Sequence, residues 1–125
     1  MLADSKAFSG FSVNDIEAAR TFYTEALGLE VTEANGMLTL HLAGDRPTLV
    51  YPKGEAHVPA SYTILNFPVD DIDSAVAGLT ARGVKFEKYE GTPMATDEAG
   101  IFRKGGPLIA WFTDPAGNVL SVIQN

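Results

Sequence analysis

Two stretches of the chain carry apolar residues at helical spacing. Between residues 16 and 27, apolar side chains recur every three or four positions, and the same spacing returns between residues 72 and 79. This period predicts two helices, each with one buried face. Short polar residues stand before both helices and a glycine stands after both, as is typical of helix ends. The predicted caps and stops are Asn14 or Asp15 with Gly28, and Asp70 or Asp71 with Gly83.

Apolar runs and alternating apolar and polar residues predict eight strands around these helices. Turn residues separate several of them. Asn35-Gly36 is typical of a tight hairpin, and Asp114–Gly117 has the proline and glycine preferred in a type I turn. The predicted strands cover residues 6–13, 29–34, 37–42, 48–51, 61–67, 84–89, 108–113 and 118–123. Each half then has the order βαβββ, and the expected fold class is α+β.

The two halves also repeat one sequence pattern. Residues 11–19 (Phe-Ser-Val-Asn-Asp-Ile-Glu-Ala-Ala) correspond to residues 67–75 (Phe-Pro-Val-Asp-Asp-Ile-Asp-Ser-Ala) at an offset of 56. A period near half the chain indicates two copies of one supersecondary unit. We therefore expect one domain over residues 1–125, with modules at about 6–52 and 61–124 joined by a connector at about 53–60. A cleft between such modules is a typical place for a small molecule to bind.

Composition excludes several classes of site. The chain has 125 residues, of which 46% are hydrophobic and 20% charged, and it contains no cysteine. Disulfides and thiolate metal sites are therefore excluded. A net charge of −7 argues against nucleic acid, which is bound mainly through lysine and arginine. No run is long and apolar enough for a membrane span, and no signal-peptide pattern is visible, so we expect a cytoplasmic protein without a membrane partner.

At this point the motifs resemble a known family. Phe11-Ser-Val-Asn-Asp-Ile16, Phe22-Tyr23, Leu27-Gly28-Leu29 and the segment Trp111–Asn118 are similar to motifs of the vicinal oxygen chelate superfamily. That superfamily contains glyoxalase I, extradiol dioxygenases, and bleomycin and fosfomycin resistance proteins. The resemblance implies paired βαβββ modules that form an open, curved, barrel-like sheet around a cavity. It also implies a homodimer.

The enzymes of this superfamily usually hold one divalent metal ion on the first and last strands of each module. The resemblance places those ligand positions at Phe8, at Leu49 or Tyr51, at Ile64 and at Ser121. Metals of this kind bind imidazole and carboxylate groups. None of these residues supplies such a group, so we expect neither a metal nor another cofactor.

The same positions would instead line an apolar cavity. Side chains alternate along a strand, so Tyr62, Ile64 and Asn66 are expected to share one face. Alternation also places His41 opposite its flanking leucines, while His57 lies in the connector. The predicted ligand-binding residues are Phe8, Tyr51, Tyr62, Ile64, Asn66, Ser121 and Trp111.

Three functions remain open at this stage. The leading hypothesis is a glyoxalase- or bleomycin-resistance-like protein that binds a small organic molecule in an apolar cavity without metal. The second is a metal-dependent lyase, isomerase or dioxygenase with an unconventional site, using His41, His57 or Glu90. The third is a degenerate module that serves as an interaction or scaffold protein.

Overall fold

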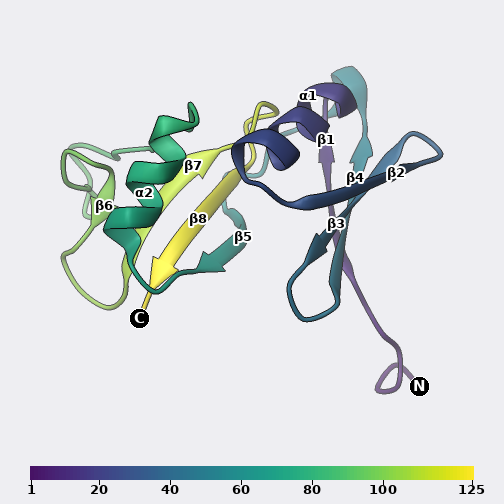
Figure 1. The fold of residues 1–125 in the computed structure, drawn as a ribbon, viewed down its shortest axis with the longest axis horizontal. Coiled ribbons are helices and arrows are strands. Elements are labelled where there is room, and N and C mark those ends of the chain that lie inside the picture. Colours follow the sequence, from purple (N-terminus) through teal and green to yellow (C-terminus); the bar gives the residue numbers. More distant parts are fainter. The chain divides into compact units, whose positions relative to one another are not determined.

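Each half of the chain folds around its own four-stranded mixed sheet. The computed structural model describes residues 1–125 and divides into two compact units, Met1–Val58 and Pro59–Asn125 (Figure 1). The α+β class predicted from the sequence is confirmed, and neither sheet closes into a barrel. No helix combines the length and the apolar character that a membrane crossing requires.

In the first unit the strand order is β1-β4-β3-β2, and only the pairing of β1 with β4 is parallel. The turn between β2 and β3 is the predicted hairpin, since Asn35 and Gly36 both have positive φ angles. Ala19 and Tyr23 are buried together with the strand residues Phe11, Leu38 and Val50. The elements are β1 (Ser9–Val13), α1 (Ile16–Thr21), a π-helical turn (Phe22–Ala26), β2 (Glu30–Ala34), β3 (Met37–Leu42), β4 (Arg46–Pro52) and a 3₁₀ turn (Gly54–Ala56).

The first helix differs from the continuous α-helix predicted over residues 16–27. Asp15 caps it as expected, accepting hydrogen bonds from the N–H groups of Glu17 and Ala18. The α-helical bonding then ends at Thr21, and the chain continues as the π-helical turn. The hydroxyl of Thr24 donates to the Arg20 carbonyl at 2.7 Å, so it competes for the acceptor that the backbone of an α-helix uses.

The second unit repeats this plan, with the order β5-β8-β7-β6 and one parallel pair, β5 with β8. Helix α2 lies against β7 and β8, with Ile72 and Val76 buried (Figure 1). Asp71 caps this helix, and Gln124 accepts a hydrogen bond from the Ile72 N–H at 2.8 Å. The elements are β5 (Thr63–Pro68), α2 (Ile72–Ala81), β6 (Ile101–Phe102), β7 (Leu108–Thr113) and β8 (Val119–Gln124).

The strand predicted over residues 84–89 is wrong. This segment makes one isolated bridge, between Phe86 and Phe112, and β6 pairs with β7 instead. Two short segments, β6 and the bridge at Phe86, therefore pair with different parts of the outer edge of β7. The sequence of 84–89 alternates like a strand, but Tyr89 has a positive φ angle that ends the extended conformation.

The turn predicted at Asp114–Gly117 is present, and buried polar side chains hold it in place. The Asp114 carboxylate accepts from the N–H groups of Ala116 and Asn118 and from the Asn118 amide. The Asn118 side-chain oxygen in turn accepts from the Ala60 N–H at 3.2 Å. Since Asp114 and Asn118 are both nearly fully buried, these bonds satisfy groups that are shielded from water and join the start of the unit to its last hairpin.

A side chain at Gly100 would disrupt the packing around it. It has a φ of +96°, and an added Cβ would lie 2.6 Å from the Cβ of Phe86. We predict that Gly100→Ala lowers the free energy of unfolding by about 2 kcal/mol or more, as measured by urea denaturation. Gly78→Ala is the control, because its Cβ meets nothing within 4 Å, and it should raise stability by about 0.5–1 kcal/mol through helix propensity. Equal stability of the two variants would contradict this account.

Candidate functional site

Each sheet has one face that packs against its helix and an opposite face, here called the helix-free face. In the second unit, Ala110 and Phe112 of β7 are fully buried, while Trp111 between them points the other way. Trp111 is directly opposite Ser121 of β8 in the register, and Ser121 is opposite Asn66 of β5. The helix-free face of this sheet therefore carries a row of aromatic and polar side chains.

A hollow of about 390 Å³ lies beside this row, and we call it the Trp111 hollow. Large apolar side chains around it are exposed: Tyr62 by 72%, Met94 by 44% and Tyr89 by 37%. The rings of Tyr89 and Trp111 meet edge to face, with centroids 5.4 Å apart. The lining residues are Ser61, Tyr62, Thr63, Tyr89, Thr92, Met94, Trp111 and Val119.

A hydrogen-bonded pair of polar side chains lies next to Trp111. The Ser121 hydroxyl donates to the Asn66 side-chain oxygen at 2.6 Å, and Ser121 is fully buried. A buried hydroxyl with its partner in place is stable as it stands. Asn66 is exposed, so its amide group is available to orient a bound molecule.

The structure places the seven predicted ligand-binding residues in both units. Tyr62 and Trp111 line the Trp111 hollow, and Asn66 and Ser121 form the pair beside it. Tyr51 belongs to the first unit, on β4 opposite Ser12, and Phe8 precedes β1 with 63% of its surface exposed. That all seven line one pocket stays a prediction.

The predicted alternation of Tyr62, Ile64 and Asn66 along one strand face is wrong. Tyr62 precedes β5, and the ladder with β8 shifts register between Thr63 and Leu65. A bulge of this kind inserts a residue without a partner and ends strict alternation. Ile64 occupies that irregular position, whereas Asn66 keeps its regular place opposite Ser121.

Both histidines are bonded to hydroxyl groups in the first unit. His41 is exposed opposite the leucines, as predicted, and its Nε2 lies 2.8 Å from the Thr32 hydroxyl. His57 in the connector is half-buried, and its Nδ1 lies 2.8 Å from the Ser12 hydroxyl. Neither histidine has acidic or histidine neighbours in a cluster that could hold a metal ion.

The metal site implied by the resemblance does not fit the residues present. Phe8 and Ile64 have no donor atom, and the alternatives on β4 are Leu49 and Tyr51. The Ser121 hydroxyl is already donated to Asn66. Imidazole and carboxylate donors are missing from all of these positions, so the donor set lacks the chemistry of a divalent transition-metal centre.

Two residues of the Trp111 hollow, Tyr89 and Met94, were not among the predicted site residues and lie in the loop between α2 and β6. The φ of Tyr89 is +47°, which is unusual for a bulky aromatic residue. The Thr92 hydroxyl and N–H both donate to the Tyr89 carbonyl, at 2.7 and 3.3 Å, and so hold this conformation. An isolated aromatic residue two positions before Gly91 in a polar loop was the available signal.

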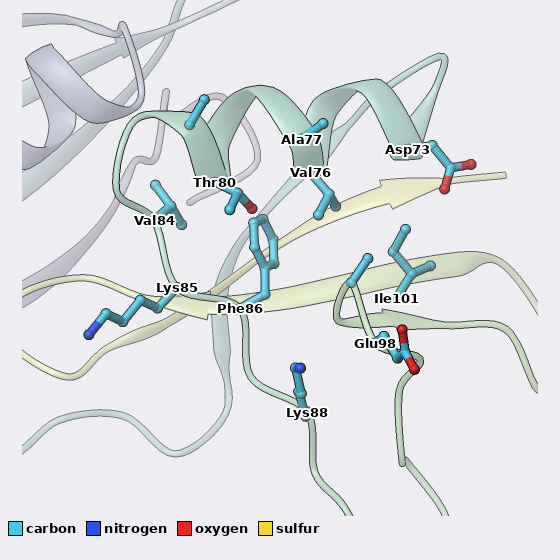
Figure 2. A pocket seen from close by; sticks show the side chains of 12 residues that line it. Asp73, Val76, Ala77, Thr80, Val84, Lys85, Phe86, Lys88, Glu98 and Ile101 are labelled. Carbon is cyan, nitrogen blue, oxygen red and sulfur yellow. The ribbon is translucent and has the colours of Figure 1, made fainter.

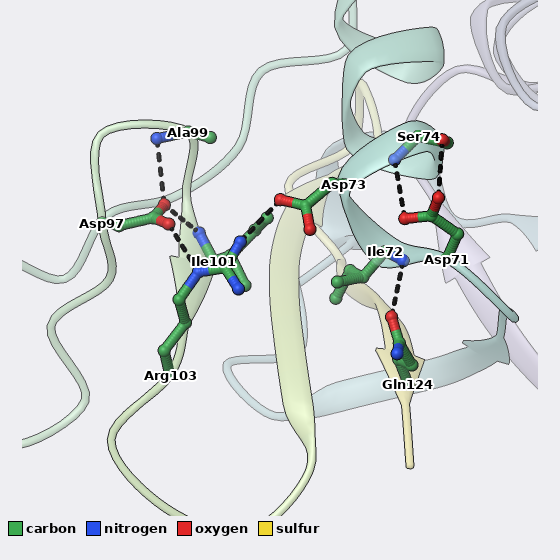
Figure 3. A network of polar contacts seen from close by, with 9 residues as sticks. All are labelled: Asp71, Ile72, Asp73, Ser74, Asp97, Ala99, Ile101, Arg103 and Gln124. Carbon is green, nitrogen blue, oxygen red and sulfur yellow. Dashed lines mark hydrogen bonds and ion pairs between the residues drawn. The ribbon is translucent and has the colours of Figure 1, made fainter.

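A polar network fastens the end of this loop (Figure 3). The Asp97 carboxylate accepts from the N–H groups of Ala99 and Ile101 and from Arg103, and Arg103 also donates to Asp73 of α2 at 2.6 Å. Burial alone would raise the pKa of Asp97. The bonds from Ile101, Arg103 and Ala99 outweigh burial and hold its pKa below the ordinary value of 3.8.

A second hollow, the α2 groove, has a volume of about 660 Å³. Its floor is apolar, and Figure 2 shows Phe86 pointing from the loop toward α2. Charged side chains lie at its rim, from Asp73, Lys85, Lys88 and Glu98. The loop therefore contributes to two hollows, with Phe86 and Lys88 lining the α2 groove and Tyr89 lining the Trp111 hollow.

Comparisons with known proteins agree with the observed fold. The family model described as Glyoxalase/Bleomycin resistance protein/Dioxygenase superfamily matches residues 8–122. TnmS3, an antibiotic binding protein from Streptomyces, is 26% identical with a TM-score of 0.69, over 99% of this chain and 98% of that chain.

Two further solved structures share the fold at lower identity. The fosfomycin resistance protein FosX from Mesorhizobium loti is 14% identical with a TM-score of 0.67, over 98% of this chain and 92% of that chain. Lactoylglutathione lyase from Agrobacterium tumefaciens is 20% identical with a TM-score of 0.64, over 98% and 96%. No curated protein sequence matches the chain.

The Asp97 network predicts a specific dependence of stability on pH. A folded-state pKa below the ordinary 3.8 means that the carboxylate stabilises the fold above that value. This stabilisation is lost as the pH falls through the lower folded-state pKa. In urea unfolding, Asp97→Asn should therefore be less stable than the parent at neutral pH, and the difference should shrink below pH 3.8. Glu98→Gln, which removes a charge from the next residue, is the control; a pH-independent deficit in Asp97→Asn would contradict the assignment.

Proposed function

The chain belongs to the glyoxalase/bleomycin resistance protein/dioxygenase superfamily, and we propose that it binds a small organic molecule without a metal ion. The binding surface is the helix-free face of the second unit, with the Trp111 hollow at its centre. The Asn66 and Ser121 pair orients the ligand beside it.

The observation that carries the proposal is the group of exposed large apolar side chains around one hollow. Tyr62, Tyr89 and Met94 leave between 37% and 72% of their surface in water beside Trp111. Contiguous exposed apolar surface of this kind is unfavourable unless something covers it, and it marks interaction sites. The few polar groups next to it are the usual means by which an apolar pocket orients a ligand.

The likeness to an antibiotic binding protein supports a binder over an enzyme. TnmS3 is described by its binding, and it matches this chain over nearly the whole length of both. FosX and the lactoylglutathione lyase share the fold alone, because their identity is lower. The predicted homodimer and cytoplasmic location remain part of the proposal.

The proposal that the protein binds its ligand without a metal ion can be tested by measuring metal content. We predict that tag-free protein, incubated with Mn, Fe, Co, Ni or Zn and then desalted, retains less than about one tenth of an equivalent of each metal by elemental mass spectrometry. A lactoylglutathione lyase carried through the same procedure is the positive control. One tightly retained equivalent would contradict the proposal and favour the alternative metal-dependent enzyme.

The single tryptophan of the chain is a built-in reporter of ligand binding, because Trp111 lines the hollow. We predict that at least one of three flat aromatic probes (proflavine, menadione and 1-anilinonaphthalene-8-sulfonate) changes the Trp111 emission on binding. Tyr62→Ala should weaken that binding about tenfold, since it removes a ring from the wall of the hollow.

The control for this measurement is Val58→Ala, which trims an exposed apolar residue of the first unit and should leave the affinity unchanged. Isothermal titration calorimetry measures the same affinities independently of fluorescence. If all three probes bind no tighter than about 1 mM, or if Tyr62→Ala binds as the parent does, the proposed site is wrong.

A further inference from the structure

We propose that the Trp111 hollow selects a flat organic cation, held against the rings of Tyr62, Tyr89 and Trp111 beside the carboxylate of Glu87. This inference rests on the proposed function and names the ligand class of the same site. It is carried by the arrangement of the rings, by the charges around them and by the conformation of Tyr89.

The rings present the surfaces that attract positive charge. The rings of Tyr89 and Trp111 are inclined at 69° to one another. Tyr62, which is largely exposed, lies on the same hollow. The face of an aromatic ring is electron-rich, and cages of several rings are the usual binding site for organic cations.

The charges around the hollow favour the same class of ligand. No lysine, arginine or histidine is among the residues that line it. The Glu87 N–H donates to the Trp111 carbonyl at 2.7 Å, so this half-buried acidic residue is fixed next to the tryptophan. Burial and then the negative charge of Glu87 raise the pKa of the Tyr89 hydroxyl.

The lysine next to Glu87 in the chain does not line the Trp111 hollow. Lys88 follows Glu87 in the chain, but it lines the α2 groove together with Phe86. Lys88 and the ring of Tyr89 thus line different hollows. The overall net charge of −7 adds an attraction for cations that depends on ionic strength.

Tyr89 reaches the hollow through a backbone conformation that tyrosine rarely adopts. Its φ of +47° is stabilised by the two hydrogen bonds from Thr92, and Gly91 provides the turn. A strained residue that is held by its surroundings is commonly found where a side chain must occupy one position for function. Here that position is the edge-to-face contact with Trp111.

The test compares two ligands of nearly equal shape and opposite charge state. At about pH 7.5, N-methylacridinium is a cation and acridine is neutral. By isothermal titration calorimetry at that pH, the cation should bind the parent protein about tenfold more tightly than acridine. Glu87→Gln and Tyr89→Leu should each weaken the binding of the cation more than the binding of acridine, and so reduce this preference.

Glu98→Gln is the matched control, because it removes the same charge from the α2 groove and should keep the full preference. Equal affinity of the two ligands, or a preference that survives in Glu87→Gln, would overturn the cation inference and leave the proposed function standing. Failure of both acridines with binding of menadione or 1-anilinonaphthalene-8-sulfonate would overturn it in the same way. Failure of every probe would overturn both proposals.

Discussion

One constraint determines how the rest of the structure is arranged: each four-stranded sheet packs against a single helix. A sheet has two faces, and one helix covers only one of them. In the second unit, Ile72 and Val76 of α2 are buried together with Ala110, Phe112, Leu120 and Val122. The opposite face then receives every second residue of the same strands, including Trp111 and Ser121. The proposed binding surface is thus a direct result of strand alternation in a sheet with a helix on only one face.

Features that depend on neighbouring residues could be predicted from the sequence. Asp15 and Asp71 cap their helices, and Asn35-Gly36 forms its hairpin, because each of these residues acts on backbone groups a few positions away. Features that depend on distant residues could not. The segment 84–89 alternates like a strand, but it makes only one bridge to β7, beside the two residues of β6.

The same distinction applies to the candidate site. Ser121 could be placed from the motif positions, and in the register it lies opposite Trp111 and Asn66. Strand alternation could not place Tyr62, Ile64 and Asn66 on one face. Ile64 escapes that reasoning because a bulge changes the register beside it. Tyr89 and Met94 belong to a loop without periodicity, and only a tertiary contact with Trp111 reveals their place. Aromatic residues in polar loops therefore need a structure before their role can be assigned.

The parallel strand pairs have a consequence for how the chain folds. In each unit the first strand pairs with the last, β1 with β4 and β5 with β8, so neither sheet is complete until its two ends meet. Such distant pairings slow folding, because a long loop must close before the contact forms. The first unit has all its strands before residue 59, however, and can close during synthesis while the second is still being made. A repeat of this kind divides one slow search into two shorter ones that can occur in sequence on the ribosome.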